Sequence, residues 1–260
     1  MTHILHIALP QFEVFIVALV RIGAILSAFP LLGARTLPTL VKAGLAVALA
    51  LTMMPFVPPV SVPADMAVVG LGLAAEFLVG LVIGLVVRSL FAGFEVAGEV
   101  MGSQMGLGVA QLVDPTSAQQ TPVLAHFQAT LASLLFLALN LHLGVVHAIG
   151  ESFRVIPPYG AALSPFLVDD VLQAFQGMFR VAVKLAAPVM VVTLVVNLVM
   201  ALLGRAVSQL NVFVLSFPLT IAVGLLALGI ALPAMAGVMT GEFESMMRTL
   251  DAVMRVLGHG

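Results

Sequence analysis

Glu95 and Glu99 stand four residues apart in a chain of 260 residues that is 62% hydrophobic and only 8% charged. On a helix this spacing places both carboxylates on one face. If the two carboxylates were buried, they would perturb each other's pKa and could couple to a proton or bind an ion. The alternative, which we favour, is a polar contact between subunits or the wetted wall of a pore, because a charge in an apolar span is only a pointer to function.

Further charges lie inside or against the apolar stretches, at Arg21, Glu76 and Lys184. A charge at the centre of a bilayer costs at least ~2.5–3.5 kcal/mol, so each of these side chains is expected to face protein or an aqueous path rather than lipid. Arg21 is expected to pair with a carboxylate such as Glu76, on this chain or on a neighbour. Asn197 is expected to make a polar contact between helices, worth ~0.6–2 kcal/mol.

Histidines are the other residues that could do chemistry. His142 and His147 are five residues apart, which places them on different faces of a helix, and His126 lies further away. The chain has no cysteine and no His-Glu-x-x-His motif, so a metal site is not expected. It also lacks the Gly-x-Ser-x-Gly and P-loop motifs. We therefore expect neither a cofactor nor an enzyme.

The composition predicts an all-α membrane protein. A soluble domain is roughly 45–50% apolar and about 25% charged, and a membrane span needs roughly 20 residues, so this chain could form about six helices. We expect a single helical domain over residues 1–235 and an amphipathic tail over 236–260, which could lie on a membrane interface or dock on a partner. The apolar segments that predict helices occupy residues 12–29, 40–57, 66–91, 123–149, 181–203 and 212–232, with a short amphipathic helix near 168–179.

A glycine-rich region follows the third apolar segment and is too polar for a lipid-facing span. Gly98, Gly102 and Gly106 recur every four residues, and on a helix they would let another backbone approach closely. Met101 and Met105 could instead repack around a moving object, because methionine is a soft gap-filler. From the residues alone, a kinked helix that packs through its glycines is favoured over a flexible plug that lines a path.

Three stretches go beyond composition. They are Phe-Pro-Leu-Leu-Gly-Ala-Arg-Thr-Leu-Pro at residues 29–38, Gly-Glu-Val-Met-Gly-Ser-Gln-Met-Gly-Leu-Gly at 98–108, and Gln-Leu-Asn-Val-Phe at 209–213, which is followed by Phe-Pro-Leu. In this order and spacing, the chain resembles the FliR family of flagellar export-apparatus membrane proteins. The resemblance covers about residues 14–232. Ser208 and Thr220 stand where the family often has proline and lysine, which loosens claims about those two positions only.

The resemblance implies a fold and a function that the residues alone do not. The family looks like a FliP-like part followed by a FliQ-like part. Its members wind as helical hairpins, together with FliP and FliQ, into a closed export gate on which FlhB and FlhA dock. This implies a hetero-oligomer in the bacterial inner membrane, at the flagellar basal body, that passes unfolded flagellar proteins. The stretch at residues 136–142 looks more like the flagellar branch than the related virulence secretion branch.

The resemblance also implies site residues, and it reverses the preference for simple packing in the glycine-rich region. It implies a gate or plug at Met101, Met105, Gly106, Leu107, Gly108, Val109 and Leu112. It favours contacts between subunits at Arg21, Arg35, Glu76, Glu95, Glu99, Lys184, Asn197, Arg205, Gln209 and Asn211. The competing hypothesis is a secondary transporter of a small solute or ion that uses intramembrane carboxylates, although the two halves of the chain show no convincing internal repeat.

Overall fold

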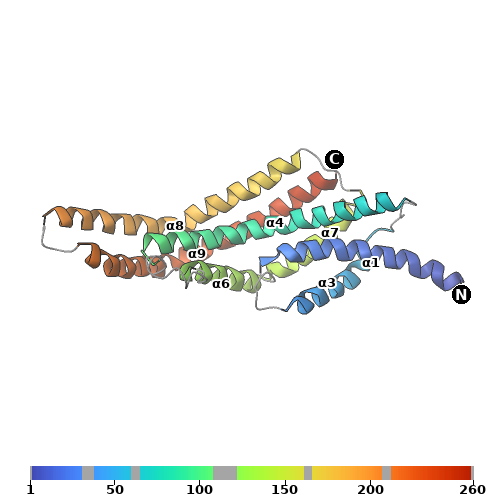
Figure 1. The fold of residues 1–260 in the computed structure, drawn as a ribbon, viewed down its shortest axis with the longest axis horizontal. Coiled ribbons are helices and arrows are strands. Elements are labelled where there is room, and N and C mark those ends of the chain that lie inside the picture. Colours follow the sequence, from blue (N-terminus) through green and yellow to red (C-terminus); the bar gives the residue numbers. More distant parts are fainter. Residues whose placement is uncertain are drawn as a thin grey trace. The chain divides into compact units, whose positions relative to one another are not determined.

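The computed structural model describes residues 2–30, 38–59, 65–107, 122–160, 166–206 and 212–258, and within these ranges the regular structure is entirely helical. The prediction of an all-α protein is therefore confirmed (Figure 1). The helices are α1 (Thr2–Ala28), α3 (Thr39–Met53), the short 3₁₀-helix η1 (Met54–Phe56), α4 (Met66–Gln104), α6 (Val123–Ala138), α7 (Leu141–Val155), α8 (Phe166–Ala206) and α9 (Val212–Gly258).

Several of these helices match the dimensions of a membrane. Five of the described helices are long and apolar enough to cross a membrane, or six spans are present if the bent pair α6 and α7 counts as one. This agrees with the expectation of about six apolar helices. The chain is a membrane protein by the length and composition of its helices.

The C-terminal helices are longer than the apolar runs predicted, and in α9 Pro233, one residue beyond the predicted end at 232, does not stop the helix. α8 continues through Pro188, and α9 continues through Pro218 and Pro233. Proline in a helix interior costs ~3 kcal/mol in water, but membrane helices tolerate it because neighbouring helices and Ser or Thr side chains satisfy the freed carbonyls. α8 also joins the helices predicted separately at 168–179 and 181–203 into one helix. The expected boundary at 235/236 falls inside α9 and stays a prediction.

The helix predicted over residues 123–149 is divided in two. α6 ends at Ala138 and α7 begins at Leu141, with a bend of 73° between them. Asn140 stands at the break with φ of 55°, in the left-handed region that asparagine enters more readily than most residues. A single asparagine in an apolar run was too weak a signal to predict this bend.

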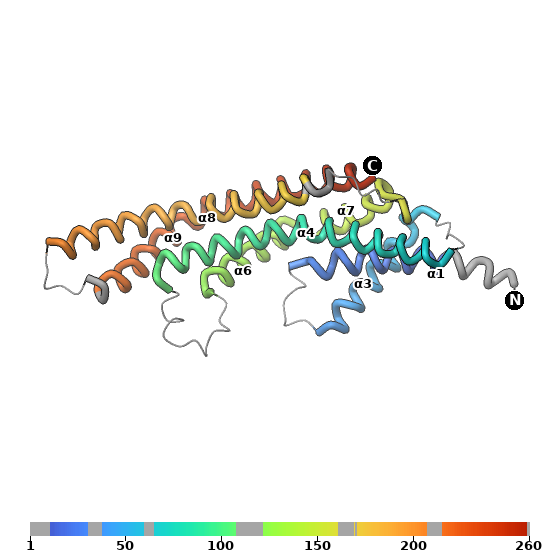
Figure 2. The backbone as a smooth tube through the Cα atoms, turned by 45° about the horizontal axis from the view of Figure 1, so that its top comes forward, coloured from blue at the N-terminus to red at the C-terminus, as the bar shows by residue number. Residues whose placement is uncertain are grey.

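The chain forms two compact units, and α4, α8 and α9 each contribute to both. Unit 1 contains residues 1–89, 139–175 and 244–260, and unit 2 contains residues 90–138 and 176–243. In unit 1, α1 packs beside α3, and Figure 2 traces both helices. The last part of α9 belongs to unit 1, where its apolar face is buried within the chain. This corrects the expectation that the face lies on a membrane interface or a partner; its residues include Met246, Leu250, Val253, Met254 and Leu257.

The core of unit 2 is an aromatic cluster contributed by α4, α6 and α9. Phe91, Phe94, Phe136 and Phe243 lie with ring centroids 5.4–5.9 Å apart, mostly in edge-to-face or tilted arrangements. Such aromatic pairs contribute ~0.5–1.5 kcal/mol each beyond the area that they bury. The cluster fixes the second half of α4 against α6 and α9, and so positions the glycine-rich end of α4.

Candidate functional site: a buried ion pair and the glycine-rich end of α4

Arg21 of α1 is fully buried in unit 1, and its guanidinium is bonded on several sides. Nε donates to Oε2 of Glu76 on α4 at 2.6 Å. Nη1 donates to the carbonyl of Ser152 at 2.9 Å, and Nη2 donates to the carbonyl of Ile156 at 3.0 Å. These carbonyls lie at the C-terminal end of α7, where the helix dipole favours a cation; the Ser152 carbonyl also accepts the backbone N–H of Ile156 at 2.9 Å. Arg21 therefore joins α1, α4 and the end of α7.

Glu76 is also fully buried, and its second oxygen is bonded as well. Oε1 accepts a hydrogen bond from the backbone N–H of Tyr159 at 3.0 Å. The ring of Phe153 lies under the Arg21 guanidinium, 4.3 Å from Cζ to the ring centroid, which adds a cation–π contact. Burial, followed by the nearby Glu76 and Glu13 carboxylates, raises the pKa of Tyr159 above its ordinary value.

The sequence left open whether Arg21 pairs with Glu76 on the same chain or with a carboxylate on a neighbouring subunit, and the structure places the pair within one chain. Both side chains are 0% exposed within a single chain, so neither reaches a neighbouring subunit. This corrects the expectation of an inter-subunit contact at these two residues. The physical reason is that the chain supplies partners for both charges itself, from α1, α4, α7 and the segment that follows α7. The pair is a structural feature of unit 1.

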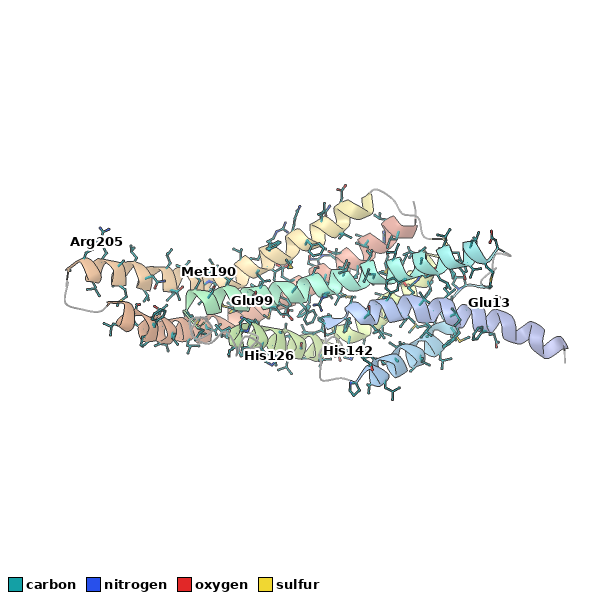
Figure 3. The ribbon with its side chains drawn as sticks, in the orientation of Figure 1. Glu13, Glu99, His126, His142, Met190 and Arg205 are labelled. Atoms are coloured by element: carbon teal, nitrogen blue, oxygen red, sulfur yellow. The ribbon has the colours of Figure 1, made fainter. Side chains whose placement is uncertain are left out.

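Glu95 and Glu99 differ from Glu76, because both are exposed on α4. Both glutamates lie on the same face of α4 as Arg88, which is also exposed and stands seven residues before Glu95. In the part of the chain that the structure describes, no ion pair is formed by either glutamate. Glu99 lies near the C-terminal end of α4 (Figure 3). The assignment of both glutamates to an inter-subunit contact or an aqueous path stays a prediction.

Two other predicted contact residues are paired inside the chain. Nζ of Lys184 on α8 donates to Oε1 of Glu242 on α9 at 2.7 Å, and the lysine side chain is half exposed. The hydroxyl of Thr220 donates to the carbonyl of Ser216 at 2.8 Å, and its oxygen also lies 3.4 Å from Oδ1 of Asn197, a longer polar contact between the same two helices. Both contacts connect α8 with α9 within one chain. An exposed ion pair of this kind contributes only about 0–1 kcal/mol.

Of the four remaining predicted contact residues, the structure describes only Arg205. Arg205 is exposed in the last turn of α8, and Figure 3 shows its side chain extending from that end of the helix. Arg35, Gln209 and Asn211 lie outside the described residues. Their assignment to contacts between subunits stays a prediction.

The glycine-rich end of α4 packs closely against α6. A Cβ at Gly98 would collide with the backbone of Leu124 and Ala125, so only glycine permits this approach. Gly102, one turn later, is in ordinary contact: its Cβ would lie 3.9 Å from Cβ of Leu124. Gly106 follows the end of α4 with φ of +78°, a left-handed conformation that favours glycine.

Met101 and Met105 are both 0% exposed in this structure. Met105 packs on α9, where a Cβ at Gly224 would lie 2.7 Å from Cγ of Met105. In this conformation the two methionines therefore fill the core of unit 2 and line no surface of the chain. Leu107 is exposed at the end of the described segment. The gate or plug assignment stays a prediction for these residues, and Gly108, Val109 and Leu112 lie outside the described residues.

Comparison with known proteins gives the family. The model of "Bacterial export proteins, family 1" matches residues 12–246. The flagellar biosynthetic protein FliR of Escherichia coli K12 is 36% identical over 219 residues, covering 84% of each chain. The protein of the same name from Bacillus subtilis 168 is 30% identical over 254 residues, covering 95% of this chain and 96% of the relative. The chain belongs to the FliR family.

Membership of the FliR family confirms the resemblance drawn from the three sequence stretches. The matched region, residues 12–246, includes Arg21, Glu76 and the whole glycine-rich end of α4. The Caulobacter vibrioides relative, also named flagellar biosynthetic protein FliR, is 31% identical over 240 residues, covering 91% of this chain and 96% of the relative. The family relationship therefore extends over both units.

One residue of this FliR-family chain escaped the sequence analysis. Gln128 on α6 is fully buried, and neither Nε2 nor Oε1 has a hydrogen-bond partner among the described residues. A buried polar group without a partner costs ~1–3 kcal/mol. The available signal was its register: Gln128 shares one face of α6 with the apolar residues Leu124, Ala125, Ala132 and Phe136, all of which are buried.

Proposed function

We propose that this chain, a component of the flagellar type III export apparatus, forms with FliP and FliQ the gate through which unfolded flagellar proteins are exported. The observation that carries the proposal is the similarity to flagellar relatives over nearly the whole chain, 95% of it in the case of the Bacillus subtilis relative. The relatives are named as flagellar biosynthetic proteins, not as enzymes. The proposed site of action is the bacterial inner membrane at the flagellar basal body.

The surface of the chain supports an assembly that only partly contacts lipid. On α8, large apolar side chains such as Leu194 and Leu198 are 66% and 61% exposed, which suits lipid or neighbouring apolar helices. On α4, by contrast, Glu95 and Glu99 are exposed in a helix long enough to span a membrane. Hydrocarbon would not accept these two charges at low cost. Partner subunits or an aqueous export path would accept them.

The partners in this proposal are FliP and FliQ within the gate and FlhB and FlhA docked upon it. The first experiment is affinity purification of the tagged full-length chain from membranes, together with complementation of a strain that lacks it. The tagged chain should recover small hydrophobic export subunits in a fixed ratio and restore secretion of flagellar proteins. A stable lone monomer that transports a solute would contradict the gate and favour the secondary transporter.

A further inference from the structure

The contact between α4 and α6 in unit 2 combines a very close approach with an unbonded polar group. At Gly98 the backbone of α6 approaches so closely that a Cβ would collide with Ala125. One turn further along α6, Gln128 is fully buried and both atoms of its amide lack partners among the described residues. One further turn along the same face, Ala132 is also buried. The unbonded amide therefore lies one helical turn from this close contact, on the same otherwise apolar face of α6.

An unbonded buried amide raises the free energy of the conformation that contains it relative to any conformation in which the amide is bonded. The buried Arg21–Glu76 pair of unit 1 shows the opposite situation, because both oxygens of Glu76 accept hydrogen bonds. The chain thus satisfies one buried polar group fully and leaves another unsatisfied. The unsatisfied amide of Gln128 therefore favours a movement of α6 that would give the amide hydrogen-bond partners.

The two ends of α6 are held differently. Towards its C-terminal end, Phe136 packs 5.7 Å from Phe91 and 5.6 Å from Phe243, measured between ring centroids. Towards its N-terminal end, α6 packs closely on Gly98 and Gly102 of α4, where the buried side chains of Leu124 and Ala125 meet glycine and no larger side chain. The glycine contact buries less side-chain area than the aromatic cluster does, so α6 can swing about its aromatic end at lower cost than about its other end.

We propose that α6 is a conformational switch, which swings away from the glycine-rich end of α4 when the gate opens, and that Gln128 favours this movement by gaining hydrogen-bond partners in the open arrangement. The proposal rests on the proposed export function. It deepens that function, because the end of α4 carries Met101 and Met105, the residues assigned to the gate.

The chain has no cysteine, so a disulfide can test the movement directly. A Cβ at Gly102 would lie 3.9 Å from Cβ of Leu124, which matches the separation of ~3.8 Å found in disulfides. In the Gly102→Cys/Leu124→Cys double variant, oxidation should abolish secretion of flagellar proteins and reductant should restore it. The two single variants under the same oxidant are the matched controls, and both should secrete normally. Complete cross-linking with unchanged secretion would overturn the proposal.

A second variant tests the amide itself. Gln128→Met replaces the amide with an apolar side chain of similar shape, so the purified complex should unfold at a higher temperature. Secretion should fall by roughly 5- to 30-fold, because the closed arrangement is favoured. A more stable complex with normal secretion, or a less stable complex, would contradict the role of Gln128. The control is a strain that lacks the chain, which should not secrete flagellar proteins until the wild-type chain is restored. If that strain does secrete them, the proposed export function is wrong, and the result does not bear on the movement of α6.

Discussion

At Arg21, a charge in an apolar protein is accommodated entirely by its own chain. The guanidinium bonds the Glu76 carboxylate and the terminal carbonyls of α7, and it stacks on Phe153. Replacing such a buried pair by apolar residues is often neutral, whereas removing one partner strands a buried charge. The pair thus makes the approach of α1, α4 and α7 highly specific, because few alternative packings would bond both charges.

Arg21→Met should therefore destabilise the protein by ~3–5 kcal/mol, because Glu76 is left buried without a counter-charge. The Arg21→Met/Glu76→Met double variant should recover most of this loss. Chemical unfolding of the detergent-solubilised protein measures both effects. Arg154→Met, which removes the exposed pair with Glu151, is the control and should change stability by less than ~1 kcal/mol. If the double variant is as unstable as the single variant, the hydrogen bonds to α7 matter more than the stranded charge.

At the scale of the helices, Gly98 sets how closely α4 and α6 approach. Gly98→Ala should destabilise the protein by ~1–3 kcal/mol, because the added methyl group meets backbone that cannot move aside. Gly177→Ala on α8 is the matched control, because beyond the adjoining backbone of its own helix no atom lies within 4 Å of the added Cβ. The control should be neutral or more stable by up to ~1 kcal/mol, since alanine favours the helix. Thermal unfolding distinguishes them, and a Gly98→Ala variant as stable as wild type would contradict the close contact.

The sequence predicted the helices much better than their ends. Long apolar runs require helices in a membrane because every backbone group must be bonded internally, so the all-α class followed directly. Their ends did not follow, because Pro233, just beyond the predicted end of α9, does not stop a helix that its neighbours support, while Asn140 stands at a bend within a predicted helix. The partner of Arg21 could be suggested from charge alone. The unbonded state of Gln128 could not, because it depends on what surrounds the residue in three dimensions.

If the segment after α4 is the plug of the gate, removing it should open a path for ions through the membrane. Deleting residues 107–112, which include Leu107 and most of the predicted plug, should make the resting membrane leak ions if this segment seals a path. A potential-sensitive dye in intact cells measures the leak, and the same deletion in cells that lack FliP is the control because no gate would assemble. Unchanged permeability in an assembled complex would favour a packing role for the segment.

At the scale of the whole molecule, the chain presents apolar helices and exposed carboxylates together. The apolar side chains on α8 suit lipid or other apolar helices, while Glu95 and Glu99 on α4 suit protein or water. A transporter would need these carboxylates to take up and release a proton or ion. An export gate would need only their polarity. The two functions therefore respond differently to the same substitution.

The Glu95→Gln/Glu99→Gln double variant keeps polar, hydrogen-bonding side chains of nearly the same size but removes both charges. If these positions contact partner subunits or an aqueous path, the variant should still assemble and secrete flagellar proteins within about a factor of 5 of wild type, because a polar contact of this kind is worth less than ~1 kcal/mol. Glu95→Leu/Glu99→Leu is the contrasting variant and should reduce recovery of the partner subunits. Secretion assays and co-purification measure both. Loss of all secretion in the glutamine variant, with assembly intact, would show that an ionisable group is required, since the shape and polarity of the contact are retained.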